Sequence, residues 1–585
     1  VLADSELYDY EGLDKWFKPE VTMKLNIKPI EGLSYTQTLG YENRQWELHQ
    51  FRSRYHRDEL NNSRNGWGKL EFSKTEHITS EGYFTYMKDF KGGHNLNATA
   101  GYSFFERNGE SFYAENYNFE VEGIKYWDLG KGTFLSDGKA GMGSSKDITE
   151  RLFSIYARAN YSYNDKYMLS ATIRHEGSSK FAAENRWGNF WAISGGWRIS
   201  AENFMKDFDW LSDLKLRFGY GVTGNNDFSA SYMANTLGSD VLWMLPNGTW
   251  VNSYGKSQNV NPDLGWEEKH EWDLGLDYSF FNNRLYGKFD VYRRKISNMI
   301  YEVKVPQPPF TQGTQWQNIG EMESKGWEFE IGGDIIQTKD FTWTSNLNLT
   351  HYTGKILTLD GSSTYKNGNG FPAPGSPGDA ARIEAGSEIG SFYIWKFAGF
   401  DENGDFLLYN KNGDVIPADD KVEADKQYLG NYIPKLMLGW NNSLRYKNFD
   451  LNISMRSWLK FDIYNQINMY FGIQGINECN VLKDAYGKFN DIRGEKQLCD
   501  YYLEDGSFLK IDAITLGYSL NLKKYTNNLV DRLRVYGTVG NVCTITGYSG
   551  MNPEVDITSW DQGTERFDGI YPLVRTYTLG IQVTF

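Results

Sequence analysis

Apolar and polar residues alternate with a period of two through most of the chain, and the pattern is clearest at its C-terminal end. There the apolar set is Tyr577, Leu579, Ile581, Val583 and Phe585, and the residues between them are small or polar. Neighbouring side chains of a β-strand point to opposite faces. The segment 573–585 is therefore predicted to be a strand with one apolar and one polar face. Such a strand suits the edge of a soluble sandwich or the wall of a transmembrane β-barrel.

The same alternation recurs in pairs of long segments joined by short turns. Segments 435–446 and 449–461 flank Lys447-Asn448, and segments 268–281 and 284–299 flank Asn282-Asn283. Two alternating segments separated by a short polar turn are typical of a β-hairpin. Counted over the whole chain, the pattern predicts about 17 strands, of which the first is Val21–Lys28 and the last is Leu573–Phe585.

The connections between these strands fall into two alternating sets, one short and one long. The segment Ser391–Phe400 has the composition of a strand, but the order of the turns assigns it to a loop. Two connections depart from the rule, because 178–186 is short for its set and 200–213 is long for the other. The long connections are 52–68, 120–151, 178–186, 224–267, 300–319, 357–434, 462–501 and 544–572.

The separation of short turns from long loops distinguishes a soluble sandwich from a transmembrane barrel. A soluble sandwich has no reason to place short turns at one end and long loops at the other, whereas a transmembrane barrel has short periplasmic turns and long outer loops. We therefore predict an all-β fold, a transmembrane antiparallel β-barrel with long extracellular loops. Residues 1–20 are expected to be an extracellular loop segment and residues 21–585 the barrel portion. Because bacterial single-chain barrels have an even number of strands, we expect an odd number of strands outside this chain.

Composition narrows the class of protein. No run approaches the roughly 18 consecutive apolar residues of a membrane helix, so a helical membrane protein is excluded. The net charge is -14 with no basic face, which argues against nucleic acid as a partner. The three cysteines lack CxxC spacing, so a structural zinc site is not supported. Cys479 and Cys499 fall in one loop, where they either form a disulfide in an oxidising compartment or remain free thiols.

A series of short motifs also occurs in a fixed order. In that order the motifs resemble the barrel of SusC/RagA-type TonB-dependent transporters of Bacteroidetes outer membranes, and the resemblance covers Val21 to Phe585. The motifs are GYGVTGN at 219–225, NPDLGWE at 261–267, NIGEM at 318–322, KGWE at 325–328, IGSFY at 389–393, YIPK at 432–435, YKNFDL at 446–451 and DGSFLK at 505–510.

The resemblance implies a barrel of about 22 strands, the size of a plugged outer-membrane transporter. It also implies an N-terminal plug, a TonB box and a signal peptide, which we expect in a longer protein whose C-terminal barrel portion is this chain. The implied function is TonB-dependent import of oligomeric nutrients, glycan or peptide, across the bacterial outer membrane. The implied partners are a SusD-like surface lipoprotein that acts as a lid and the TonB complex, which pulls on the plug.

Other functions remain as alternatives. A siderophore or cobalamin receptor is a second kind of transporter, and a passive porin or a surface adhesin belongs to a different class. No GxSxG, HExxH or P-loop motif occurs, so no enzyme is expected. The seven histidines are scattered along the chain, and their proximity in the fold stays open.

Three groups of residues are candidates for sites. The polar strand positions Lys215, Arg217, Glu271, Asp273 and Asp277 are predicted to face the lumen, where they hold a plug by hydrogen bonds or are simply solvated. Loop aromatics can stack on sugar rings or anchor a protein partner, or they pack within the loops; they are Trp243, Trp250, Phe310, Trp316 and Trp560. Asp401, Asn403 and Asp405 have the alternate oxygen spacing of a calcium loop. Phe406 replaces the glycine of that pattern and Asn412 its glutamate, so a plain hairpin turn is favoured and no cofactor is expected.

Overall fold

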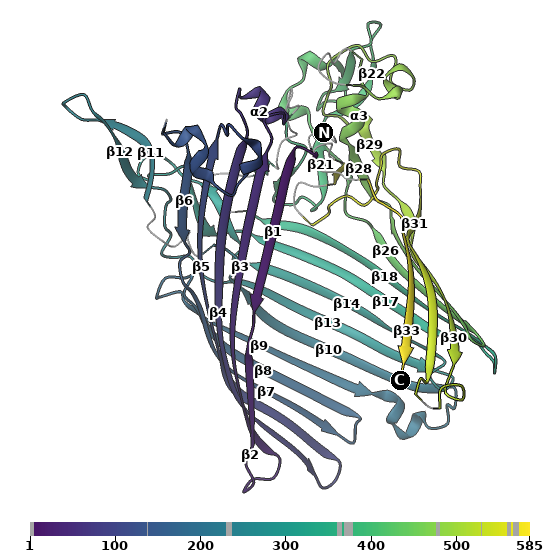
Figure 1. The fold of residues 1–585 in the computed structure, drawn as a ribbon. Coiled ribbons are helices and arrows are strands. Elements are labelled where there is room, and N and C mark those ends of the chain that lie inside the picture. The colour runs from purple at the N-terminus through teal and green to yellow at the C-terminus, as the bar shows by residue number, and fades with distance from the viewer. Residues whose placement is uncertain are drawn as a thin grey trace.

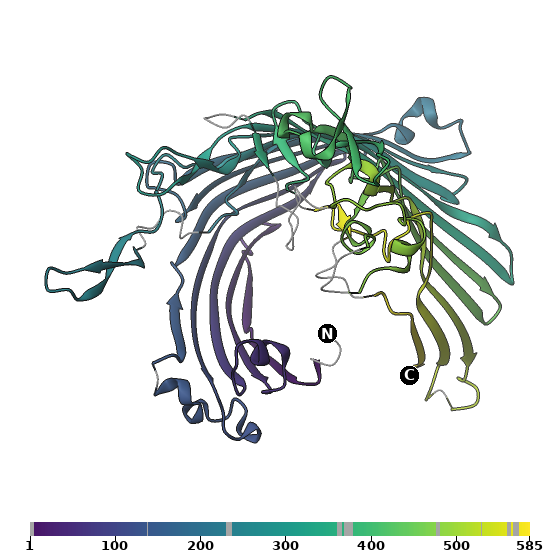
Figure 2. The same cartoon turned by 90° about the horizontal axis from the view of Figure 1, so that it is seen from above.

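One large antiparallel sheet forms most of the computed structural model and curves into the wall of a barrel (Figures 1 and 2). The structure describes residues 5–136, 138–229, 237–359, 365–367, 378–474, 480–527, 529–558, 563–565 and 572–585. Its sheet contains β1 (Tyr8–Phe17), β2 (Glu20–Asn26), β3 (Leu33–Arg52), β4 (Trp67–Phe90), β5 (His94–Tyr117), β6 (Gly141–Lys146), β7 (Glu150–Tyr163), β8 (Tyr167–Ser178), β9 (Trp187–Arg198), β10 (Leu211–Asn225), β13 (Glu267–Phe280), β14 (Leu285–Ser297), β17 (Glu321–Gln337), β18 (Phe341–Thr358), β26 (Leu436–Tyr446), β27 (Phe449–Leu459), β30 (Phe508–Asn521), β31 (Arg532–Thr546) and β33 (Thr576–Thr584).

These nineteen strands occupy seventeen positions around the wall, here called staves, because two staves each consist of two strands that lie end to end. β1 and β2 lie end to end along β3, and β6 and β7 lie end to end along β5. Each stave pairs with the next stave along the chain, always antiparallel. The strand count predicted from the alternation is confirmed. Within the described ranges β33 pairs only with β31, and β1 and β2 pair only with β3, so both edges of the curved wall are open.

The prediction of a loop over residues 1–20 is wrong for most of that segment. β1 pairs with β3 from Tyr8 opposite Arg52 to Phe17 opposite Asn43, and β2 continues the same stave. Pro19 lies between the two strands and lacks the N–H that the hydrogen-bond ladder requires, which explains the interruption. The upper part of this stave does not alternate between apolar and polar residues, so its sequence gives no period-two signal.

Short turns and long loops lie at opposite ends of the wall, as predicted (Figure 1). At the lower end, the connection from β9 to β10 contains two short 3₁₀ helices, η4 (Ile199–Ala201) and η5 (Asn203–Met205). At the upper end, the smaller loops contain α2 (Arg57–Asn61), η1 (Glu122–Ile124), η2 (Leu129–Lys131), η3 (Thr133–Leu135), and the hairpins β11 (Leu237–Met244) with β12 (Trp250–Lys256) and β15 (Ile300–Lys304) with β16 (Thr314–Asn318).

The two largest outer loops fold together into a separate body, here called the loop layer (378–434 and 462–505). The segment 391–400 belongs to it as β21 and β22, which pair with β25 and β23 and not with the wall, as predicted. Its elements, with the short strands that join it, are β19 (Tyr365–Asn367), β20 (Arg382–Glu384), β21 (Ser391–Ile394), β22 (Lys396–Phe400), β23 (Phe406–Tyr409), β24 (Val415–Pro417), η7 (Ala418–Asp420), η8 (Glu423–Asp425), β25 (Gln427–Asn431), β28 (Asp462–Asn465), α3 (Gln466–Phe471), η9 (Lys483–Tyr486), η10 (Asp500–Tyr502), β29 (Leu503–Asp505) and β32 (Thr564–Glu565).

A single apolar core holds the loop layer together. Phe392, Tyr432, Tyr464 and Tyr502 are fully buried in it and come from both loops. The backbones also join, because Trp395 N donates to Leu498 O over 3.1 Å. No helix in the described part of the chain is long and apolar enough to cross a membrane.

Candidate functional site

The five predicted lumen residues lie on one face of the wall, on β10 and β13. Asp277 is opposite Lys215, and Asp273 is opposite Gly219. Residues paired across an antiparallel ladder share a face, and so do residues two apart on one strand. Glu271 and Arg217 therefore belong to the same face. The other face carries Leu216, Phe218 and Leu274, which are exposed. In a transmembrane barrel the apolar face contacts lipid and the polar face lines the lumen.

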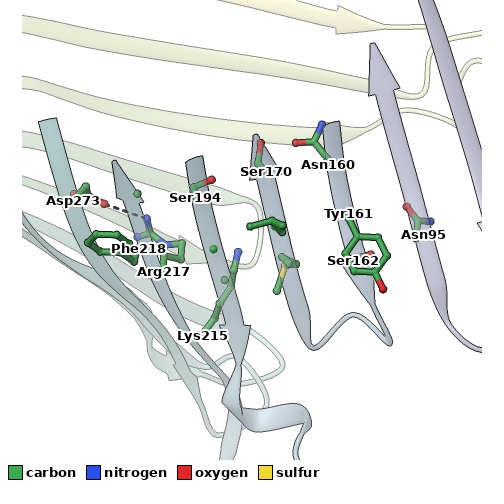
Figure 3. A pocket seen from close by; sticks show the side chains of 15 residues that line it. Asn95, Asn160, Tyr161, Ser162, Ser170, Ser194, Lys215, Arg217, Phe218 and Asp273 are labelled. Carbon is green, nitrogen blue, oxygen red and sulfur yellow. Dashed lines mark ion pairs between the residues drawn. The ribbon is translucent and has the colours of Figure 1, made fainter. Parts of the chain in front are cut away.

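Arg217 is the centre of an ion-pair network on this face. Its guanidinium lies 2.9 Å from a carboxylate oxygen of Asp277 and 2.7 Å from one of Asp290. It also lies 3.9 Å from Asp273, and Figure 3 shows this ion pair. Sequence reasoning missed Asp290, although a period-two count from Lys288 on β14 places it in the polar row. Charge-assisted hydrogen bonds of this kind are the strong ones. The network therefore ties β10, β13 and β14 together across the lumen face.

Glu271 belongs to a second small network on the same face. Its carboxylate lies 2.9 Å from Arg294 Nε and 3.3 Å from Lys269 Nζ. Lys215 Nζ approaches Asp277 at 3.9 Å. Each carboxylate named here thus has a basic neighbour, and the cluster presents paired charge instead of a field of one sign.

Beside this cluster the lumen face carries uncharged side chains, several of them small. A cavity of about 410 Å³ spans β5 to β13 (Figure 3). Its lining on this face includes Asn95, Asn160, Ser162, Met168, Ser170, Ser194, Gly196 and Gly219. The serines and glycines leave space beside the longer side chains. The surface offers room beside a charged cluster, which suits contact with a polar segment or solute.

A larger cavity of about 790 Å³ lies where the loop layer meets the wall. Its charged lining comes from four separate segments of the chain. Burial raises the pKa of Asp462, and the nearby charge of Asp505 acts in the same direction. Sequence reasoning missed this cavity because no single segment carries its signature. The charged residues that line it are Glu384, Glu388, Lys435, Lys460, Asp462 and Asp505.

The predicted loop aromatics do not gather at one place. Trp243 and Trp250 lie on the β11–β12 hairpin, with Trp250 opposite Met244, and their side chains are 63% and 61% exposed. This hairpin extends away from the wall (Figures 1 and 2). Phe310 is half-buried in the turn between β15 and β16, and Trp316 packs against a separate apolar cluster. Trp560 lies outside the described residues.

That apolar cluster explains one of the sequence motifs. Within NPDLGWE, Leu264 and Trp266 are buried against Phe181. Gly265 N donates to Asn318 Oδ1 over 2.7 Å, and Asn261 Nδ2 donates to Trp316 O over 2.9 Å. Trp266 Nε1 also donates to a backbone carbonyl of the loop 178–186. The motif therefore clamps three outer loops together and has a structural role.

Asp401, Asn403 and Asp405 form a tight hairpin turn between β22 and β23. Asp401 Oδ1 accepts the backbone N–H groups of Asn403, at 2.9 Å, and Asp405, at 2.8 Å. These hydrogen bonds, led by the one from Asp405, lower the pKa of Asp401. The turn 410–414 repeats the geometry with Asn410 as the acceptor. Across the described part of the chain no group of three or more His, Cys, Asp or Glu residues is placed to hold a metal ion.

The predicted cysteine pair is described only at Cys499. Its thiol is free and buried in the core of the loop layer, and burial raises its pKa to about 12. Cys479 lies outside the described residues.

Comparison with known proteins places this wall in a family. The family model described as TonB dependent receptor-like, beta-barrel matches residues 8–542. TonB-dependent receptor P3 of Formosa agariphila is 29% identical over 585 residues, covering 95% of this chain and 57% of that protein. TonB-dependent receptor SusC of Bacteroides thetaiotaomicron is 33% identical over 451 residues, covering 74% of this chain and 44% of that protein.

A solved structure matches over nearly the whole chain. The RagAB peptide transporter superposes with a TM-score of 0.84 at 21% sequence identity, covering 99% of this chain and 63% of that one, and this likeness shows the fold. The resemblance read from the motifs is confirmed. The chain spans about half the length of the curated relatives it matches. It belongs to the TonB dependent receptor-like β-barrel family, whose barrels span the bacterial outer membrane.

Proposed function

We propose that the protein to which this chain belongs imports oligomeric nutrients, glycan or peptide, across the outer membrane in a TonB-dependent manner. The observation that carries this proposal is a wide transmembrane wall with a polar lumen face beneath a folded loop layer. The proposal assigns the chain a role in transport and includes neither catalysis nor a cofactor.

The width of the wall supports transport of a large solute. Barrels of 16 to 18 strands already enclose an aqueous channel, and barrels of about 22 strands hold a plug in the lumen. The seventeen staves here alone reach the size of a channel. A lumen of that width needs something to block it when no substrate passes, and a plug moved by TonB supplies such a block.

The relatives support an oligomeric substrate. RagAB, which matches in fold, is described as a peptide transporter. Oligopeptides and oligosaccharides both present repeated hydrogen-bonding groups, and a cavity lined by both acidic and basic side chains fits such ligands. The exposed Trp243 and Trp250 add flat faces on which sugar rings stack.

The loop layer supports the proposed lid. We propose that a SusD-like surface lipoprotein docks on the outer loops and that the TonB complex acts on a plug from the periplasmic side. A body with its own apolar core presents a surface of fixed shape, which a docking partner requires.

Calorimetry and co-purification test the proposal. Full-length protein purified in mild detergent is titrated with a panel of oligosaccharides and oligopeptides, and a ferric siderophore and cobalamin serve as controls. We expect binding of one oligomer class and co-purification of a lipoprotein of comparable size. Binding of only the siderophore or cobalamin contradicts the substrate class, and a protein that always purifies alone contradicts the lid.

A further inference from the structure

The connection from β9 to β10, residues 199–210, is longer than the turns of two to six residues that form most of the lower end of the wall. It contains η4 and η5, and it lies beyond the lower ends of both strands (Figure 1). Three of its aromatic side chains are open to the surroundings: Phe204 is 62% exposed, Phe208 44% and Trp210 49%. Three aromatic side chains this exposed require another molecule to cover them.

The exposed aromatics continue the lipid-facing surface of the wall. Trp210 stacks on Phe280 with ring centres 5.5 Å apart, and Phe208 meets Trp210 edge to face at 6.0 Å. Phe280 in turn stacks on Tyr278, at 5.5 Å. Phe280 and Tyr278 share their face of β13 with Leu274, which is on the lipid side. A strip of rings therefore runs without a break from the wall into the turn.

Glu202 fixes the turn against the lower ends of β8 and β9. Its carboxylate accepts hydrogen bonds from Tyr167 Oη at 2.5 Å, from Trp197 Nε1 at 3.2 Å and from Lys166 Nζ at 3.2 Å. Tyr167 and Trp197 are opposite each other on the lipid face. Tyrosine and tryptophan on that face place their polar ends at the boundary between lipid and water. Glu202 therefore marks the level of that boundary.

Charged residues lie among the aromatic residues of the turn. Lys206, Asp207 and Asp209 are all exposed and alternate with the apolar residues. A segment that combines exposed aromatic residues with exposed charges suits the plane of a membrane interface, where one kind contacts lipid and the other contacts water.

We propose that residues 199–210 form an in-plane anchor seated in the headgroup–acyl boundary of the inner leaflet of the outer membrane. The occupant is glycerophospholipid, and continuity with the lipid-facing wall is the reason. The anchor fixes the depth of β9 and β10 in the bilayer, and β10 carries Arg217. The anchor thereby also holds the Arg217 ion-pair network at a fixed depth in the membrane.

Spin labelling tests the anchor directly. Single cysteines replace Phe204, Phe208 or Asp209 in the full-length protein, which is reconstituted in vesicles of phosphatidylethanolamine and phosphatidylglycerol. The unsubstituted protein is labelled in parallel to subtract any signal of its own cysteines. Collision of the nitroxide with oxygen and with a water-soluble nickel complex is then measured. We expect the nickel accessibility at 204 and 208 to be several-fold lower than at 209, with high oxygen accessibility at both.

Either of two outcomes overturns the proposal. Equally high nickel accessibility at all three positions shows that the turn lies in the aqueous periplasm. Protection of 204 and 208 from both reagents shows that protein covers the aromatics. A label at Lys339, in the short turn between β17 and β18, is the matched control and is expected to be open to nickel.

Discussion

The wall and the loop layer are stabilised in different ways. In the wall, long hydrogen-bonded ladders join neighbouring staves, the apolar residues point outward, and charged side chains pair across the lumen face. In the loop layer, apolar residues from two distant loops point inward and form one buried core. The first arrangement needs a membrane to cover its apolar face, whereas the second resembles a small soluble domain.

This difference separates the two functions that the molecule must combine. A wall made of ladders keeps its shape while its lumen surface stays polar and open. A loop body with its own core keeps a fixed outer surface without help from the membrane. A change in one region should therefore leave the other intact, and the predictions that follow depend on this independence.

The largest effect is expected from Phe392→Ala, which empties part of the loop-layer core. Phe392 is 1% exposed, and a buried Phe→Ala change costs about 3–5 kcal/mol. We expect the loop layer to become sensitive to protease on intact cells, while the barrel keeps its heat-modifiable migration on gels. Phe218→Ala on the lipid face is the matched control, with no change in protease sensitivity. Loss of the folded barrel band in Phe392→Ala contradicts the independence of the two regions.

The next effect is expected in the wall from Arg217→Met. The change leaves Asp277 and Asp290 without their shared cation and is expected to cost about 1.5–3 kcal/mol, the range for hydrogen bonds to charged groups. The midpoint of urea unfolding from vesicles measures this cost. Arg293→Met removes an exposed pair with Glu323 and is expected to cost less than about 1 kcal/mol. Equal costs for the two variants argue against the network as a support of the wall.

A smaller effect concerns pH and the loop layer. Burial raises the pKa of Asp500, whose carboxylate accepts the N–H of Phe397 over 2.6 Å. An acid with a raised pKa binds more protons folded than unfolded, between its ordinary and its raised pKa. Lowering the pH through that window therefore stabilises the loop layer, as read by hydrogen exchange. Asp500→Asn should flatten this dependence.

Asp401 serves as a control, because its contribution to the stability of the loop layer should change with pH in the opposite direction. Its pKa is lowered by backbone hydrogen bonds, so the stability that it contributes is present above its ordinary pKa and is lost as the pH falls. In Asp401→Asn the loop layer should therefore lose less stability as the pH is lowered. A change of the same sign in both variants contradicts the assigned causes.

The sequence predicted the wall well because a strand exposed to lipid on one side and to water on the other must alternate. From that alternation alone, the five polar residues of β10 and β13 were predicted to share a face, and the ladder register agrees. The loop layer was not predicted, because its core joins residues such as Phe392 and Tyr464 that are far apart in the chain and have no common period. The stave 8–26 was misjudged at its upper end for a related reason, since Tyr8–Phe17 lacks a regular apolar face.

The smallest effect on stability is expected from Trp243→Ala. The side chain is exposed on the β11–β12 hairpin, so the free energy of unfolding should change by less than about 0.5 kcal/mol. Calorimetric affinity for the oligomer ligand should nevertheless fall, because a stacking surface is lost. Trp316 packs against the apolar cluster that joins three outer loops, so Trp316→Ala should instead destabilise those loops. Unchanged affinity in Trp243→Ala removes this residue from the binding surface.

Uptake by living cells tests the central claim most directly. A labelled oligosaccharide or oligopeptide that binds the purified protein is offered to cells with and without the gene, before and after collapse of the proton gradient. The proposed import predicts accumulation that requires the gene and stops when the gradient is lost. Accumulation that requires the gene but survives loss of the gradient would identify a passive pore and contradict TonB-dependent import.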